Sequence, residues 1–173
     1  YNSISALQRE VVFRTDVAGV TKIATDAAKV IKELAKPVID SGTEIIYEYT
    51  AESFSGTEPK YAVDVCSAVA DELGVSKEKP MIFNLPSTVE CCLPNQYADE
   101  IEYFISHFPY TKDSVISIHP HNDRGTGIAS AELALLAGAQ RVEGTLFGNG
   151  ERTGNMDLVN LAMNMYVRGI DPG

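Results

Sequence analysis

The chain of 173 residues alternates short runs rich in β-branched and aromatic residues with longer segments of helical periodicity. This alternation is typical of consecutive β–α–β units, which build a parallel sheet covered by helices. The predicted strands are residues 43–49, 80–85, 114–119 and 141–147. The predicted helices are residues 19–34, 58–73, 95–108, 127–137 and 156–166. The sequence therefore predicts an α/β fold in a single domain.

Two parallel-sheet architectures fit this alternation, an open doubly wound sheet and a (β/α)8 barrel. An open nucleotide-binding sheet carries a glycine-rich loop after its first strand, whereas Gly148 and Gly150 follow the last predicted strand and lack the third glycine of the motif. Polar clusters end every predicted strand instead, as in a barrel active site. Four strands and a stub cannot close a barrel of eight. We therefore predict the C-terminal half of a TIM barrel, about the end of strand 4 to strand 8. Residues 1–173 would be a partial catalytic domain truncated at both ends.

Charge and cysteine content exclude several classes of partner. The formal net charge of -10 disfavours nucleic acid and anionic membranes, because the average field repels phosphate groups. No apolar run approaches the roughly 18 residues of a membrane span. Cys66, Cys91 and Cys92 form no C-x-x-C pair, which indicates reduced thiols, and we interpret Cys91 and Cys92 as structural rather than nucleophilic. We expect a cytoplasmic protein, or an organellar one in a eukaryote.

The most specific feature is the pair His119 and His121. Side chains at i and i+2 of an extended backbone point the same way, so two imidazoles at a strand end can chelate one divalent ion. The alternative is two surface histidines, or one buried and one exposed. The neighbouring Asn122 and Asp123 favour a metal site. His107 is predicted to be an ordinary helix-end residue.

A glycine-rich loop at residues 148–155 follows the last predicted strand. Its glycines would let the backbone approach a ligand closely, and Asn155 offers an oxygen ligand to a metal. The alternative is a strand-to-helix turn in which Asn155 caps the final helix. Because this loop lies one strand after the histidine pair, a shared site is favoured.

Four other polar side chains have two interpretations each. Glu52 is either an acid/base group that can also orient a metal-bound water, or a helix-start residue in a turn. Thr88 either donates to a substrate carboxylate or caps a helix. Arg124 and Arg152 either bind an anion or pair with neighbouring carboxylates. The residues alone leave these alternatives open.

Five segments resemble motifs of the 2-isopropylmalate synthase and homocitrate synthase family. Ser-Ile-His-Pro-His-Asn-Asp-Arg-Gly at 117–125 resembles the family's H-x-H-[ND]-D-x-G signature. Residues 148–155 resemble the family's loop after the last barrel strand, and residues 84–90 resemble its sixth-strand motif. Residues 47–58 resemble its fifth-strand motif, and residues 1–9 resemble the end of its fourth strand. The motifs occur in the family's order and span the entire chain, so the resemblance is specific.

The resemblance implies a Claisen condensation of acetyl-CoA with 2-oxoisovalerate that gives 2-isopropylmalate, the committed step toward leucine. A homocitrate or citramalate synthase, or an inactive metal-binding fragment, is the alternative. The implied cofactor is a divalent ion (Mg, Mn, Zn or Co), with acetyl-CoA as cosubstrate and a monovalent cation as a further activator. The implied parent protein is a homodimer. The implied metal ligands are His119, His121 and Asn155. Thr88 would bind the substrate carboxylate, and Glu52 would lie beside the reacting groups. The pocket for the substrate side chain would be lined by Thr50, Asn84 and Pro86, and acetyl-CoA would contact Asn149 and Glu151.

The chain departs from the family pattern in two respects. Family members often carry Ser-Pro-Glu where this sequence has Thr50-Ala51-Glu52, and the larger Thr50 would trim the pocket. Residues 1–173 also lack the family's first strand, whose Arg-Asp pair supplies the remaining metal ligand. The subdomain with the proposed base and the leucine-sensing domain are absent as well. We therefore expect these residues to be inactive alone.

Overall fold

The computed structural model describes residues 1–172, which form a parallel sheet of five strands. Each strand pairs with the next one along the chain, so the spatial order equals the sequence order. The strands are β1 (Asn2–Ser3), β2 (Glu48–Glu52), β3 (Met81–Ser87), β4 (Ser114–Pro120) and β5 (Arg141–Val142). A doubly wound sheet reverses its strand order at one point, and none of these strands does so.

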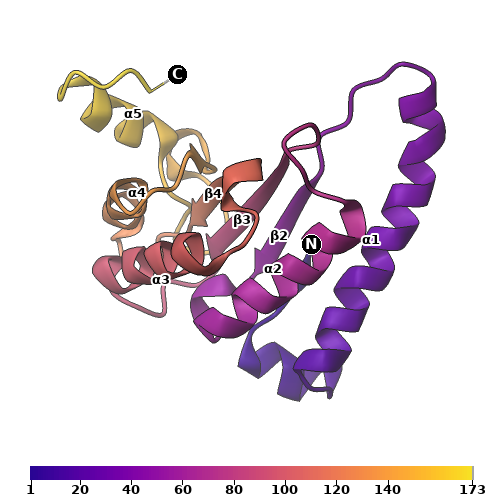
Figure 1. Cartoon of the computed structure of the whole chain (residues 1–173). Helices are drawn as coiled ribbons and strands as arrows, with labels where there is room; N and C mark the ends of the chain where they lie inside the picture. The colour runs from indigo at the N-terminus through magenta and orange to yellow at the C-terminus, as the bar shows by residue number, and fades with distance from the viewer. Residues whose placement is uncertain (173) are drawn as a thin grey trace.

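The connecting helices lie along one side of the sheet, each against its neighbour in the sequence (Figure 1). Right-handed crossovers between sequential parallel strands place all their helices on the same face, as in a barrel wall. The helices are α1 (Val17–Asp40), α2 (Pro59–Leu73), α3 (Pro94–His107), α4 (Gly127–Leu136) and α5 (Leu158–Tyr166). No helix within residues 1–172 has both the length and the hydrophobicity to cross a membrane.

The two faces of the sheet differ sharply in chemistry. Strand side chains that point toward the helices are apolar and buried, among them Phe83, Leu85, Ile116 and Ile118. Alternate positions on the opposite face are polar, and the register places one row of them side by side: Thr50, Asn84, Ser117 and Arg141. Because strand side chains alternate between faces, the apolar core lies between the sheet and the helices, and the polar groups lie on the opposite face of the sheet.

The core under the helices is built around aromatic rings. Phe104 of α3 is fully buried, makes an edge contact with Phe54 at a centroid distance of 6.1 Å and stacks on Phe108 at 4.8 Å. Tyr97 is also buried and donates its hydroxyl to the carbonyl of Leu85 in β3. These contacts tie α3 to the sheet next to the strand end that carries the histidines.

Two predicted strand ranges were wrong. Residues 43–47 are not strand, and β2 instead extends to Glu52, so Glu52 is the last strand residue rather than a turn residue. β5 stops at Val142 instead of continuing to 147. The Glu143 amide still donates to Ile118 of β4. The amide of Thr145 then donates to Met156 and that of Leu158 donates to Thr145, so from Thr145 on this segment pairs with the chain that follows it.

The final helix begins later than predicted. Asp157 is the N-cap of α5 and accepts from the amides of Val159 and Asn160 at 2.9 and 3.3 Å. The predicted helix start at 156 was therefore wrong. The alternative in which Asn155 caps this helix is excluded as well, which leaves Asn155 available for other contacts. α1 is longer than predicted and runs on to Asp40, while α2, α3 and α4 lie within one residue of their predicted bounds.

Glu100 on α3 should make folding stability depend on pH. Burial is the main cause that raises the pKa of the Glu100 carboxyl from 4.5 to about 7, and the charge of Asp99 raises it further. The Oε2 atom of Glu100 is buried without a hydrogen-bond partner. The folded protein therefore retains this proton better than the unfolded chain, so the stability is full below pH 4.5 and declines as the pH rises toward 7. We expect Glu100→Gln to raise the free energy of unfolding at pH 8 by roughly 1–2 kcal/mol, allowing for partial exposure. Urea unfolding at pH 4 and pH 8 measures this. The exposed Glu102→Gln is the control, and an equal effect in both variants would contradict the assignment.

Candidate active site at the carboxyl ends of the strands

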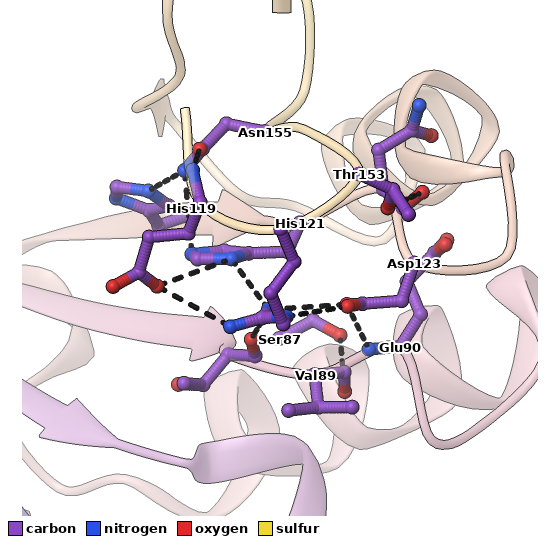
Figure 2. Close-up of polar contacts among 12 residues, drawn as sticks. Ser87, Val89, Glu90, His119, His121, Asp123, Thr153 and Asn155 are labelled. Atoms are coloured by element: carbon purple, nitrogen blue, oxygen red, sulfur yellow. Dashed lines mark hydrogen bonds and ion pairs between the residues drawn. The ribbon is translucent and has the colours of Figure 1, made fainter. Parts of the chain in front are cut away.

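The two histidines meet as their spacing predicted. His119 lies in β4, and His121 follows the strand end and forms a bridge with Asn155. Their ring centroids are 5.2 Å apart. Both rings turn their Nε2 atoms toward the Asn155 amide, whose Nδ2 lies 3.1 Å from His119 and 3.3 Å from His121 (Figure 2). Side chains from β4, from the residue after its end and from the loop before α5 thus converge on one point.

The outer nitrogen of His119 faces a carboxylate. Glu143, two residues after Arg141 in β5, places its Oε2 2.9 Å from His119 Nδ1. The same oxygen accepts from Asn84 Nδ2 at 3.1 Å, and Oε1 accepts from Arg141 at 2.5 Å. Burial raises the pKa of the Glu143 carboxyl, but its contacts with His119, Glu48 and Arg141 outweigh burial and leave that pKa below its ordinary value. Glu143 is therefore an ionised acceptor.

The outer nitrogen of His121 faces a cation instead. Arg152 places NH2 2.9 Å from His121 Nδ1, and the nearest carboxylate oxygen, that of Glu151, is 3.8 Å away. Burial, followed by His119 and Arg152, lowers the pKa of His121. His121 is thus held in its neutral form, which is the form that ligates metals.

Three loops at this edge of the sheet are fastened to one another. Arg152 donates to Asp123 at 2.6 Å and to the Thr88 carbonyl at 2.6 Å. Asp123 in turn accepts from the amide of Glu90, and the Glu90 carboxylate is buried and accepts from the Arg124 amide and the Thr126 hydroxyl. The loops after β3, β4 and β5 therefore hold His121 in place together.

The donor set fits a divalent ion in part. Two imidazole nitrogens and an amide on one point suit Zn, Mn or Co. The Asn155 Oδ1 accepts from the Glu151 amide at 2.9 Å, so the amide must turn about its Cβ–Cγ bond to offer oxygen to an ion. Within residues 1–172 no cluster of three or more His, Cys, Asp or Glu side chains is arranged to hold a metal. Among these residues the candidate donors are therefore two imidazoles and one amide.

The residues assigned to the oxo-acid pocket lie beside this cluster. Asn84 Nδ2 is 3.4 Å from Thr50 Oγ1, and Pro86 is the register partner of His119. Asn84 Oδ1 is buried without a hydrogen-bond partner, which is unusual for an acceptor in a folded protein. These three residues line one wall next to the imidazoles.

Glu52 and Thr88 lie together on the neighbouring strand ends. The Thr88 hydroxyl accepts from the Ser53 amide at 2.9 Å and caps no helix, because Leu93 is the N-cap of α3. Glu52 accepts from the Ser53 hydroxyl at 2.8 Å. Ser53 thus connects the two candidate residues. Asn149 and Glu151 are exposed on the loop after β5.

Contacts and burial decide the interpretations of Arg152, His107 and Cys92. Arg152 pairs with Asp123, so its role as a free anion binder is not supported. His107 stacks on Tyr103 and contacts its carbonyl at the end of α3, as predicted. The pKa of the Cys92 thiol is raised to about 12, mainly by burial, which agrees with an unreactive cysteine.

Sequence reasoning missed Glu143, Arg141, Glu48 and Glu90. Glu48 begins β2, while Arg141 and Glu143 flank Val142 at the end of β5, and such spacing of charged residues is found in any amphipathic strand. A signal existed in Arg141-x-Glu143, because two ionisable groups at i and i+2 in a parallel strand must face the same side. Which groups these two residues face became evident only from the pairing of β4 with β5.

Comparison with known proteins bears on this arrangement. A family model described as HMGL-like matches residues 1–173. The chain belongs to the HMGL-like family. Within it, the resemblance to 2-isopropylmalate synthases is confirmed. The chain is 56% identical over 173 residues to the 2-isopropylmalate synthase of Rhodospirillum rubrum and 55% identical over 172 residues to that of Bifidobacterium longum. These alignments cover 100% and 99% of this chain but only 31% and 27% of the relatives, so the chain spans less than a third of their length.

Solved structures of the family show the same fold. The HMG-CoA lyase of Bacillus subtilis superposes with a TM-score of 0.66 and 17% identity, over 98% of this chain and 55% of that one. The HMG-CoA lyase of Acinetobacter baumannii, in complex with coenzyme A and 3-methylmalate, gives a TM-score of 0.62 and 20% identity, over 97% and 53%. The predicted α/β fold with a barrel-type parallel sheet is confirmed at this level.

Proposed function

We propose that this chain is part of an acyltransferase that condenses acetyl-CoA with 2-oxoisovalerate to give 2-isopropylmalate. The observation that carries the proposal is the 56% identity to a 2-isopropylmalate synthase across the whole chain. The matched region is the whole chain, so it contains the site described above. We further propose that residues 1–173 are the C-terminal half of a TIM barrel, from about the end of strand 4 to strand 8.

The site residues have complementary roles in this reaction. We propose that a divalent ion would be held by the Nε2 atoms of His119 and His121, which converge on the Asn155 amide, and by Asn155 Oδ1 once that amide has turned. When bound, that ion supplies Lewis-acid polarisation of the ketone of the oxo acid. The Thr88 hydroxyl accepts from the Ser53 amide, which leaves its proton free to donate to the substrate carboxylate.

The remaining residues shape the pocket and its entrance. Thr50, Asn84 and Pro86 are proposed to enclose the side chain of the oxo acid, with Asn84 Oδ1 as an unused acceptor on that wall. Glu52, at the end of β2, is proposed to offer a carboxylate beside the reacting groups. A family member was solved with coenzyme A, and we propose that Asn149 and Glu151, exposed on the loop after β5, meet the acetyl-CoA.

Steady-state assays with three oxo acids test the proposed substrate. The protein that carries this sequence should use 2-oxoisovalerate with a kcat/KM at least about 10-fold above that for pyruvate or 2-oxoglutarate, because one methylene in an apolar pocket discriminates by roughly 10–200-fold. Free CoA release measures turnover. A preference for pyruvate would indicate a citramalate synthase, and a preference for 2-oxoglutarate a homocitrate synthase. Either result would reject the proposed substrate.

A further inference from the structure

The two imidazoles of the site differ in what faces their outer nitrogens. His119 Nδ1 lies 2.9 Å from a carboxylate oxygen of Glu143, whereas His121 Nδ1 lies 2.9 Å from a guanidinium nitrogen of Arg152. A carboxylate can only accept, so it requires a proton on His119 Nδ1. A guanidinium can only donate, so it cannot select that tautomer at His121.

Glu143 is itself firmly held. Its Oε1 accepts from Arg141 at 2.5 Å and its Oε2 accepts from Asn84 at 3.1 Å, in addition to the contact with His119. Arg141 is fastened in turn to the Ser117 hydroxyl at 3.0 Å on the neighbouring strand. The Glu143 side chain is only 23% exposed, so few other hydrogen-bond partners, including water, can reach it. A fixed carboxylate of this kind also fixes the orientation of the imidazole that binds it.

We propose that Glu143 is the positioning residue of the site: it holds His119 in the Nδ1–H tautomer and thereby directs the Nε2 lone pair toward His121 and Asn155. The proposal rests on the proposed metal role of His119, but its first consequence, the tautomer, exists without any metal. Glu143 touches no substrate and acts only through His119. Arg141 and Asn84 support it by holding its two oxygens.

The tautomer of His119 in metal-free protein is the first test. Long-range ¹H–¹⁵N spectra at pH 8 distinguish the two ring nitrogens, and His119→Gln assigns the signals by difference. We expect one Nδ1–H tautomer for His119 in the wild type and a mixture of tautomers in Glu143→Gln. Glu132→Gln is the matched control, because Glu132 also accepts a hydrogen bond, from Asn164 at 2.8 Å, on a helix away from the site.

Metal affinity is the second test. Titration with Co²⁺, followed by its d–d absorption and by competition with a chelator, should show a 10–100-fold weaker Kd for Glu143→Gln and a change below about 3-fold for Glu132→Gln. Glu143→Asp keeps the charge and should recover part of the affinity. Circular dichroism confirms that each variant is folded.

The outcomes separate this inference from the proposed function. A wild-type His119 that is the Nε2–H tautomer, or a Glu143→Gln variant with unchanged tautomer and unchanged Co²⁺ affinity, overturns the role of Glu143 and leaves the proposed reaction standing. A wild-type protein that shows the expected tautomer but binds no Co²⁺ rejects the metal site, while the role of Glu143 in orienting His119 is upheld.

Discussion

Replacing His119 by alanine is expected to lower kcat/KM for 2-oxoisovalerate and acetyl-CoA by about 1000-fold or more, which corresponds to roughly 4 kcal/mol of lost transition-state stabilisation. The substitution removes one of the three groups that converge on the proposed ion position. It also leaves the Glu143 carboxylate without its imidazole partner. Initial rates together with the metal content of the purified protein measure both effects.

His107→Ala is the matched control for this substitution. His107 is exposed at the end of α3 and contacts Tyr103, so its loss should leave turnover and metal content unchanged. Unchanged turnover in His119→Ala would contradict the metal role of the histidine pair. Lost turnover with full metal content would indicate that His119 serves the reaction in some other way.

Truncating Phe104 to alanine is expected to have the largest effect on stability. Phe104 is fully buried and contacts both Phe54 and Phe108. Removing a buried aromatic ring costs about 3–5 kcal/mol, because the lost transfer free energy adds to the cost of the cavity. Urea unfolding should show a lower midpoint without a change in slope.

Two further variants make this result specific. Phe104→Leu retains much of the volume and should cost less than the alanine variant. Phe147→Ala removes the same ring from a position that is 69% exposed, and its effect should stay within about 0.5 kcal/mol. Equal losses in Phe104→Ala and Phe147→Ala would contradict the position of the core between the helices and the sheet.

The order of the elements could be predicted because it depends on local patterns. Apolar runs and helical periodicity located β3, β4 and the bodies of all five helices, since both signals arise from neighbouring residues. The ends of β2 and β5 could not be predicted in this way. Residues past Val142 have a strand-like composition, yet from Thr145 on the backbone pairs with residues 156–158 instead of with β4. Such pairing depends on residues that are distant along the chain from β4.

The histidine pair shows what the sequence by itself determined. The spacing of His119 and His121 at a strand end already requires both imidazoles to lie on one side, because strand side chains alternate. The residues alone favoured a site shared with Asn155 and left the roles of Thr88 and Glu52 open, and the resemblance assigned a role to each. The local pattern Arg141-x-Glu143 placed both groups on one side but did not indicate that Glu143 faces His119, which depends on where β5 lies.

Only the tertiary structure decided which charges surround the pair. The parallel register places Arg141 beside Ser117 and brings Glu143 to His119, and the loop after β5 carries Arg152 to His121. These contacts join residues 24 and 31 positions apart in the chain. Their geometry follows from sheet register and loop packing, which are set by the whole fold and not by any short segment.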